Sequence, residues 1–486
     1  MKNKKIGFIA LLALIVVLLT GAFFVALLSI VNANEQSMAE ENVDIASFSA
    51  YTDVEEFQNV PAMVVQGTSI GDAEDYGNGT YLLGVSGTTE QNYEDYLATL
   101  EQAGYKKHSD NGEDKMEGYA RTASYTKDDI TVTVSHAITI DKTYISATKN
   151  GTLSEHLIYK DEYVADNVAG AQTELYLVEL YESGNSYIIK LKNGHFIVHD
   201  GGYEVEGQYL VELLESLTDG DQKPVIEAWF ISHAHEDHHG AMVKIAMDSK
   251  LSSRLIVQGV YFNTPSPSFL ATSDVSPVTV QTVTTAARTF DNGEGGKSPL
   301  YRPQFGQRYY FNDIVIDVSL TPEQYATSTY YTADFNDTSI WLKHFIEGQI
   351  FFLGGDSAHT GARTMINMFD KSYADVDIFS VLHHGINVYN YFTDFVEAET
   401  VLYTNWRFGS VYQNNTNVVS ARLEENAKLQ ASAKECYHYG DGTVKLSFPY
   451  AVGTAEILPE NPWKYHVGDH VKTYPTNEGT ATLIMD

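Results

Sequence analysis

The sequence predicts a layered α/β fold built from two similar halves, and three observations support this prediction. A strand-like apolar segment, Val225–Ile231, runs directly into a loop that is rich in histidine and carboxylate side chains. A Ser-led strand, a Gly turn and an apolar strand followed by Asp occur twice, ending at Asp200 and at Asp356. Within each half, strand-like segments come first and helical segments follow, which is typical of a layered α/β domain.

Residues 1–33 predict a membrane anchor. Lys2, Lys4 and Lys5 precede residues 6–31, which contain no charged residue. A membrane helix needs about 20 apolar residues, whereas the apolar part of a signal peptide has about 7–15. Length favours an uncleaved anchor, and a Val-Asn-Ala sequence at 31–33 leaves a long signal peptide as the alternative. The lysines before the span predict that the body lies outside the cytoplasm, in a single-pass protein of the cell membrane.

Residues 34–48 are acidic and polar without periodicity, and they predict a linker. Residues 49–155 predict a small α/β domain with an accessory or substrate-presenting role. Its histidines, His108 and His136, are isolated, so we do not expect it to carry the chemistry. Its predicted strands are residues 80–84, 119–125, 130–134 and 138–147, and its predicted helix carries Tyr93, Tyr96, Leu97 and Leu100 at helical spacing.

Residues 170–455 predict the main α/β domain, and residues 456–486 a short polar C-terminal tail. Between the two halves, residues 262–300 are rich in Pro, Ser, Thr and Gly, which predicts an irregular binding loop or lid. Residues 435–444 are hairpin-like and contain His438, a weak candidate for a substrate contact.

The histidine-rich loop predicts a metal site. His233, His235, Asp237 and His238 fall within six residues, directly after the strand. His233 and His235 are two apart and can point to one side, so they can hold one metal ion. Asp237 and His238 face elsewhere, which predicts a second ion a few Å away. Imidazole and carboxylate are ligands that suit zinc, iron or manganese.

This His-x-His-x-Asp-His pattern resembles the metallo-β-lactamase-fold hydrolase superfamily, whose other motifs follow in order. Residues 196–202 are similar to its strand ending in Asp-Gly, and residues 350–356 to its strand ending in a metal-bridging Asp. Residues 378–385 are similar to the His-His-Gly of the competence-channel (ComEC) type and of phosphorylcholine esterases. The resemblance covers about residues 170–455, and it implies a four-layer αββα sandwich.

The resemblance also implies roles for single residues. The implied metal ligands are His233, His235, Asp237, His238, Asp356 and His384, and the implied catalytic residues are Asp237, His383 and Asp200. Asp356 bridges two ions, zinc first with manganese or iron as alternatives, and a metal-held hydroxide is the nucleophile. Asp200 orients a ligand. His384 is the ligand of the His-His pair and His383 the substrate contact, with the reverse assignment open.

The sequence departs from the superfamily at one position, because it has no His from 240 to 343 to complete the first metal site. In the competence-channel subgroup the equivalent stretch is Asn-x-x-Ser, which Asn336 and Ser339 match. The first ion is then held by His233, His235, Asp356 and water. Three further histidines are interpreted from their placement: His344 as structural, His239 as a solvated neighbour of the cluster, and His359 either as a contact for an anionic substrate or as an ordinary surface histidine.

Composition narrows the substrate class. The chain has 64 acidic and 31 basic residues, so its formal charge of −33 disfavours stable nucleic-acid binding unless a local basic patch or the metals overcome it. Together with the implied metal chemistry, this makes a metal-dependent surface hydrolase the leading hypothesis, acting on a phosphoester or related ester bond of a small-molecule or cell-surface substrate. The alternatives are a competence-type nuclease, which needs a basic track, and a non-enzymatic surface binding module. A lactamase is possible by fold alone.

Overall fold

The computed structural model describes residues 54–458, 472–476 and 479–483, with gaps at 66, 72, 78, 113, 161–166, 181–183, 264, 327–333, 387, 405–418 and 440–441. The predicted anchor and linker lie outside these residues. Within the part of the chain that is described, no helix is both long and apolar enough to cross a membrane.

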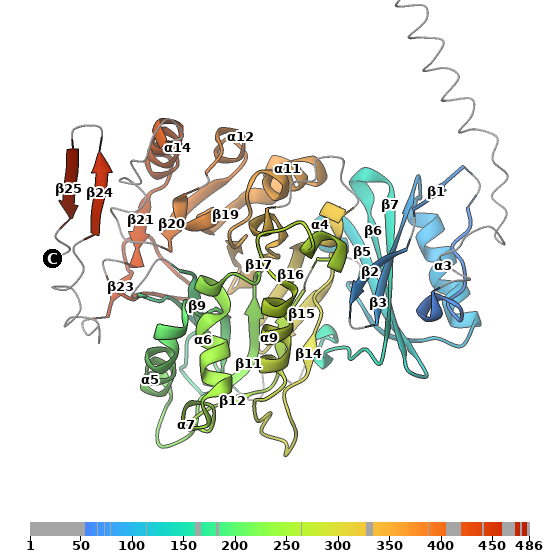
Figure 1. Cartoon of the computed structure of the whole chain (residues 1–486), viewed down its shortest axis with the longest axis horizontal. Coiled ribbons are helices and arrows are strands. Elements are labelled where there is room, and N and C mark those ends of the chain that lie inside the picture. The colour runs from blue at the N-terminus through green and yellow to red at the C-terminus, as the bar shows by residue number, and fades with distance from the viewer. Residues whose placement is uncertain are drawn as a thin grey trace, which may run out of the picture.

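The main body consists of a first and a second β-sheet packed face to face (Figure 1). The first sheet has the order β14-β13-β11-β10-β9-β8-β22-β23, with β12 beside β11. Its strands are β8 (Glu174–Leu177), β9 (Ser186–Lys190), β10 (Phe196–Asp200), β11 (Val225–Ile231), β12 (Ile256–Val257), β13 (Val260–Phe262), β14 (Leu300–Tyr301), β22 (Val444–Ser447) and β23 (Glu456–Ile457). The second sheet runs in chain order through β15 (Arg308–Phe311), β16 (Ile314–Leu320), β17 (Trp341–Ile346), β18 (Gln349–Leu353), β19 (Asp375–Ser380), β20 (Glu397–Tyr403) and β21 (Glu435–His438).

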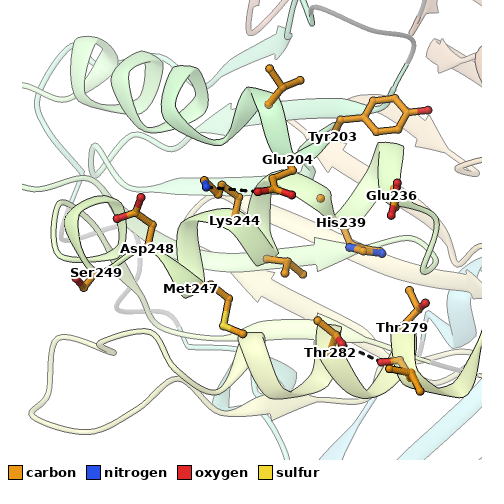
Figure 2. A pocket seen from close by; sticks show the side chains of 14 residues that line it. Tyr203, Glu204, Glu236, His239, Lys244, Met247, Asp248, Ser249, Thr279 and Thr282 are labelled. Atoms are coloured by element: carbon orange, nitrogen blue, oxygen red, sulfur yellow. Dashed lines mark hydrogen bonds and ion pairs between the residues drawn. The ribbon is translucent and has the colours of Figure 1, made fainter.

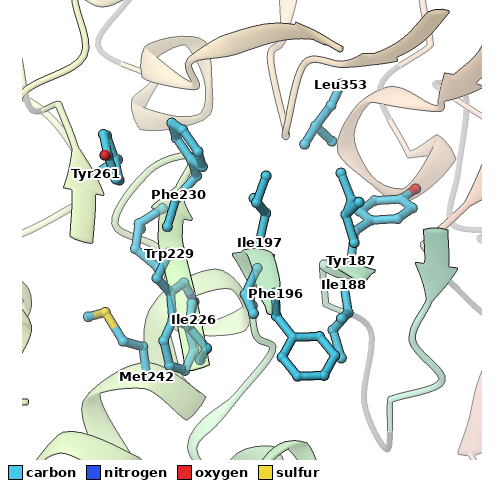
Figure 3. Close-up of a cluster of buried hydrophobic side chains, with 14 of the residues drawn as sticks. Tyr187, Ile188, Phe196, Ile197, Ile226, Trp229, Phe230, Met242, Tyr261 and Leu353 are labelled. Carbon is cyan, nitrogen blue, oxygen red and sulfur yellow. The ribbon is translucent and has the colours of Figure 1, made fainter. Parts of the chain in front are cut away.

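Helices cover the outer face of each sheet, so the predicted mixed α/β class is confirmed. The first sheet packs against α5 (Gly207–Leu217), α6 (Glu236–Met247) and α9 (Pro277–Ala287), and the second against α11 (His359–Met368), α12 (Asn390–Thr393) and α14 (Val419–Ser432). Between the sheets, the buried rings of Tyr187 and Phe351 lie 5.3 Å apart. Met242 of α6 belongs to the same apolar cluster as Ile226 (Figure 3). Burying one such large side chain stabilises the fold by about 1.5–3 kcal/mol.

The two halves repeat one pairing pattern. Strands β9 and β10 are antiparallel, and β11 and β13 then add in parallel. In the second half, β17 and β18 are antiparallel, and β19 and β20 add in parallel. Gly194 and Gly348 make the matching turns with φ of 84° and 79°, a conformation that suits glycine. The predicted internal repeat is therefore confirmed.

A small sheet precedes the main body. It has the order β1-β3-β7-β6-β5-β4, with β2 beside β3. Helix α3 (Glu90–Gln102) buries Tyr93, Tyr96, Leu97 and Leu100 against it, as the spacing predicts. The strands are β1 (Ser69–Ile70), β2 (Glu74–Gly77), β3 (Thr80–Ser86), β4 (Lys106–Asp110), β5 (Ala120–Lys127), β6 (Ile130–Ala137) and β7 (Lys142–Lys149). The predicted strand 138–147 begins too early, because residues 138–140 form a 3-10 turn and Asp141 has φ of 49°.

The small domain is fixed to the second sheet by polar contacts. The Nη1 of Arg308 lies 3.0 Å from Asp114 Oδ2, and the Nζ of Lys343 lies 2.5 Å from Glu117 Oε2. Asp114 caps α4 (Lys115–Gly118) and Glu117 lies within it; in this short turn Lys115, Met116 and Glu117 have positive φ. Lys343 is almost fully buried, so removing Glu117 would leave an uncompensated charge in the interface.

Two further predictions are wrong in detail. Residues 262–300 are not an irregular loop, because Ser266 and Ser276 cap α8 (Pro267–Leu270) and α9, each with Pro in the first turn. Residues 435–444 do not form a hairpin, since β21 pairs with β20 and β22 pairs with β8. This segment instead crosses from the second sheet to the first. In the tail, β24 (Lys472–Thr476) pairs with β25 (Gly479–Leu483).

Candidate metal centre

The predicted ligands meet where strands of both sheets end. Strand β11 ends at Ile231, and His233 and His235 follow before α6 begins at Glu236. In the second sheet, Asp356 follows β18 and His384 follows β19. Because carboxyl ends of parallel strands face one edge of a sheet, the layered fold brings these distant segments together.

Four of the predicted ligands form one cluster. One ligand atom each from Asp237, His238, Asp356 and His384 lies within 4.8 Å of all the others. The Nε2 of His384 is 3.1 Å from Asp237 Oδ2 and 3.1 Å from Asp356 Oδ2. Asp237 is partly exposed and the other three are buried, so the cluster opens to solvent on one side.

Hydrogen bonds fix the orientation of both imidazoles. The Nδ1 of His238 lies 2.8 Å from Asp200 Oδ2, and the Nδ1 of His384 lies 2.9 Å from Thr404 Oγ1 and 3.1 Å from its carbonyl oxygen. Each bond places the proton on Nδ1 and leaves the Nε2 lone pair facing the cluster. The buried Nε2 of His238 has no hydrogen-bond partner among the described residues, although Asp356 Oδ2 is 3.2 Å away. A divalent cation fits this donor set, because it satisfies the orphaned nitrogen and the carboxylates together.

The electrostatics of the cluster favour a cation. Burial opposes charge on Asp356, but His238, His384 and His383 hold its pKa well below the usual range. Burial also opposes charge on His384, but Asp356 and Asp237 raise its pKa to about 9. Asp356, Asp237 and Asp200 overcome burial in the same way and raise the pKa of His238. The negative charge of the carboxylates, which raises the pKa of these imidazoles, would equally stabilise a divalent cation bound in the cluster.

Asp200 supports the cluster from behind. Its carboxylate is buried and accepts hydrogen bonds from the backbone and hydroxyl of Ser232, from Asn185 Nδ2 and from His238 Nδ1, at 2.6–2.8 Å. Asp200 adopts φ of 54°, which is uncommon outside glycine and asparagine and costs about 1–3 kcal/mol. This geometry agrees with an orienting role and gives Asp200 no place among the ligands.

His233 and His235 form a second group beside the first. The Nε2 of His233 lies 3.0 Å from His235 Nδ1 and 3.1 Å from Asn336 Oδ1. The other nitrogen of His233 faces the hydroxyls of Ser232 and Ser339, at 3.1 and 3.3 Å. Asn336 and Ser339, the residues of the predicted Asn-x-x-Ser stretch, thus both lie beside His233.

His383 lies at the open side of the cluster. Its Nε2 is 3.6 Å from Asp356 Oδ2, and its side chain is 16% exposed, whereas His384 is buried. Burial lowers the pKa of His383 to about 4, so the ring is neutral near pH 7, with one donor and one acceptor. Both histidines have positive φ, 47° and 53°, a strained backbone conformation. Their ring planes lie at 75° to each other.

Three further histidines considered in the sequence lie outside the cluster. His344 is buried in the core, with Nε2 3.0 Å from His199 Nε2. His359 begins α11, and its Nδ1 lies 2.9 Å from the Tyr391 hydroxyl. His438 is buried and stacks on Tyr403 at 4.5 Å.

The prediction that His239 is solvated is wrong. It is buried on α6, and neither ring nitrogen has a hydrogen-bond partner among the described residues. Its ring borders a groove of about 810 Å³ between α6, α9 and the turn at Tyr203 (Figure 2). An ion pair of Lys244 with Glu204, at 3.4 Å, lines the middle of this groove, between His239 and Asp248 (Figure 2). None of the six predicted metal ligands is among the described residues that line it.

Sequence reasoning did not identify several residues of the site. Thr404 orients His384, Asn185 and Ser232 hold Asp200, and Asp274 Oδ2 lies 3.3 Å from His235 Nε2. Asn185 and Ser232 adjoin predicted strand ends and could have been considered. No pattern in the sequence around Thr404 or Asp274 indicates that these residues belong to the site.

No protein-family model and no curated protein matches the chain. Parts of it are similar to two solved structures. One is Zn(2+)-bound PqqB from Methylobacterium extorquens, with 10% identity over 52% of this chain and 85% of that chain, and a TM-score of 0.32. The other is Tm1679, a metal-dependent hydrolase of the beta-lactamase superfamily, with 9% identity over 55% of this chain and 95% of that chain, and a TM-score of 0.32. At such low similarity, function must be inferred from the residues of this chain.

Proposed function

We propose that the chain is a metal-dependent hydrolase of the metallo-β-lactamase superfamily. One observation carries this proposal: ligand atoms of Asp237, His238, Asp356 and His384 lie within 4.8 Å, around a buried His238 nitrogen that has no hydrogen-bond partner among the described residues. The layered α/β fold, with its ligands at strand ends, agrees with the superfamily that the sequence motifs resemble.

Divalent ions, zinc first with manganese or iron as alternatives, would be held at both groups. Asp237, His238 and His384 would form the stronger site and His233 and His235 the weaker one, with Asp356 of the first cluster as a ligand shared by both. A bound divalent ion supplies Lewis-acid activation of water and of a substrate oxygen. Asp200 keeps His238 in the tautomer that offers Nε2. His383, neutral and partly exposed at the open side of the cluster, is placed to donate a hydrogen bond to the substrate or leaving group.

We propose a phosphoester or a related ester as the substrate class, with the body held outside the cytoplasm by the N-terminal segment. The two adjacent ligand groups support an anionic substrate, because neighbouring ions can bind both of its oxygens. The charge of −33 supports a small or cell-surface substrate over a nucleic acid. The uncharged span at residues 6–31 supports the location.

Hydrolysis assays with the purified full-length chain test this function. Bis-p-nitrophenyl phosphate, p-nitrophenyl phosphorylcholine and nitrocefin separate phosphodiesterase, phosphorylcholine esterase and lactamase activities. We expect turnover of a phosphoester that a chelator abolishes and that zinc or manganese restores. Turnover that survives complete metal removal would contradict the proposal. Nitrocefin hydrolysis alone would keep the metal chemistry and overturn the substrate class.

A further inference from the structure

A separate cavity of about 440 Å³ lies between the small domain and the main body. The small domain contributes Thr80 and Thr148 of β3 and β7, together with Lys149. The main body contributes Arg288 at the end of α9, and residues 297–302 leading through β14. Domain interfaces are a preferred location for ligand sites. Since none of the metal-site residues is among the described residues lining the cavity, it is a distinct site.

The charge of this interdomain pocket is opposite to that of the chain. Lys149, Arg288, Lys297 and Arg302 line it, and none of the described lining residues is a carboxylate. In a chain with 64 acidic and 31 basic residues, an unselected surface would be mostly acidic. Concentrated positive charge on a negative protein raises the local concentration of anions at that point alone.

Two of the four cations have no counter-charge among the residues that the structure describes. Lys149 pairs with Glu55, and Arg302 Nη2 lies 2.9 Å from the buried Glu323 Oε1. Arg288 and Lys297 make no ion pair within the described part of the chain, and both are exposed. The Nζ of Lys297 donates only to the Thr289 carbonyl, at 2.7 Å. The pocket therefore keeps a net positive charge that a ligand can reach.

The rest of the lining suits an oxyanion. Hydroxyls of Thr80 and Thr148 lie 3.1 Å apart at the small-domain wall, where one hydroxyl proton remains available to a ligand. The ring of Tyr301 is partly exposed and adds an aromatic surface. Guanidinium groups bind tetrahedral oxyanions through paired N–H donors, and ammonium groups act as point charges.

From this geometry we propose that the interdomain pocket binds a phosphate-type oxyanion, either a small phosphate or a phosphate of a polymer. Arg288 and Lys297 supply the binding charge, and Lys149 on the other wall lets the ligand contact both domains. Anion binding in this pocket does not depend on hydrolysis at the metal centre. The pocket also forms a local basic patch, which the overall negative charge of the chain would not predict.

Calorimetric titration of the full-length chain with inorganic phosphate tests the site, in excess chelator so that bound metal contributes nothing. We expect saturable binding that weakens with salt, and that the double variant Arg288→Gln/Lys297→Gln weakens by about tenfold or more. Lys250→Gln is the matched control, because Lys250 is exposed on α7 (Ser249–Ser252) outside the pocket. It should bind as the unchanged chain does.

Titration with short linear polyphosphate, run in parallel, distinguishes a small phosphate from the phosphate of a polymer as the ligand. Tighter binding of polyphosphate than of phosphate indicates a polymer, and equal affinity indicates a small ligand; both outcomes support the pocket. No binding of either probe in chelator, or equal binding by the double variant, overturns it. Circular dichroism confirms that each variant is folded, and phosphoester turnover measured with metal reports on the metal centre independently.

Discussion

Replacing Asp200 by Asn tests whether this residue controls metal binding without being a ligand. The substitution keeps the size and shape of a side chain that is buried and surrounded by donors. Asn185 Nδ2, the Ser232 hydroxyl and His238 Nδ1 all contact Oδ2, and the Ser232 amide contacts Oδ1. Either orientation of the new amide therefore points an NH2 group at a donor.

The expected magnitude follows from these contacts. Loss of a partner that orients a metal-binding His typically weakens metal affinity by about 10–100-fold, or about 1.4–2.7 kcal/mol. The unsatisfied buried groups should also reduce the free energy of unfolding of the metal-free chain by about 1–3 kcal/mol. Affinity falls because His238 loses the charged acceptor that holds its proton on Nδ1.

Competition with a zinc-binding dye measures affinity, and urea unfolding of the metal-free chain measures stability. Asp317→Asn is a suitable control, since Asp317 is equally buried but pairs with Arg308, away from the ligands. The control should lose stability and keep its metal affinity. An Asp200→Asn variant with unchanged affinity would refute the orienting role, whatever its stability.

Other predictions address the His-His pair, acid stability and the N-terminal segment. His384→Ala should lose bound metal, whereas His383→Ala should keep metal and lose about 10²–10⁴-fold in phosphoester turnover; the opposite pattern in metal analysis would exchange their roles. Burial lowers the pKa of His199 well below its usual range and that of His344 to about 3, so the unfolded state binds more protons below about pH 6.5. As the pH falls below that value, the free energy of unfolding should decrease by up to about 1.4 kcal/mol per pH unit for each ring. Chemical unfolding measured across this pH range should show a weaker pH dependence when both histidines are replaced by Phe. Deleting residues 1–34 should yield a folded soluble protein, while the full-length chain sediments with membranes; its recovery in a washed supernatant, beginning at Asn34, would argue for cleavage.

Local patterns were sufficient for much of the fold. The apolar run at Val225–Ile231 is a strand with the predicted bounds, and the helical spacing from Tyr93 to Leu100 gives the buried face of α3. The repeated phrase before Asp200 and Asp356 predicted the matching hairpins. Each of these signals is carried by side chains a few residues apart, where periodicity and turn chemistry dominate.

Long-range pairing could not be read in the same way. The local sequence around His438 resembles a hairpin, but each strand finds its partner in a different sheet. Thr404 reaches His384 only because β20 lies beside β19. His239 looks polar and exposed in sequence, yet helix α6 turns it into a buried position. Such placements depend on tertiary packing, which overrides local polarity.

The most direct test of the proposed metal centre is the metal content of the purified chain. After loading with zinc and removal of free ion, mass spectrometry of the metals should give about two ions per chain. Asp356→Ala should reduce both, because we propose its carboxylate as a ligand shared by the two sites, and His233→Ala should reduce only one. Asp317→Asn should match the unchanged chain. Full metal content in Asp356→Ala, or none in the unchanged chain, would contradict the account.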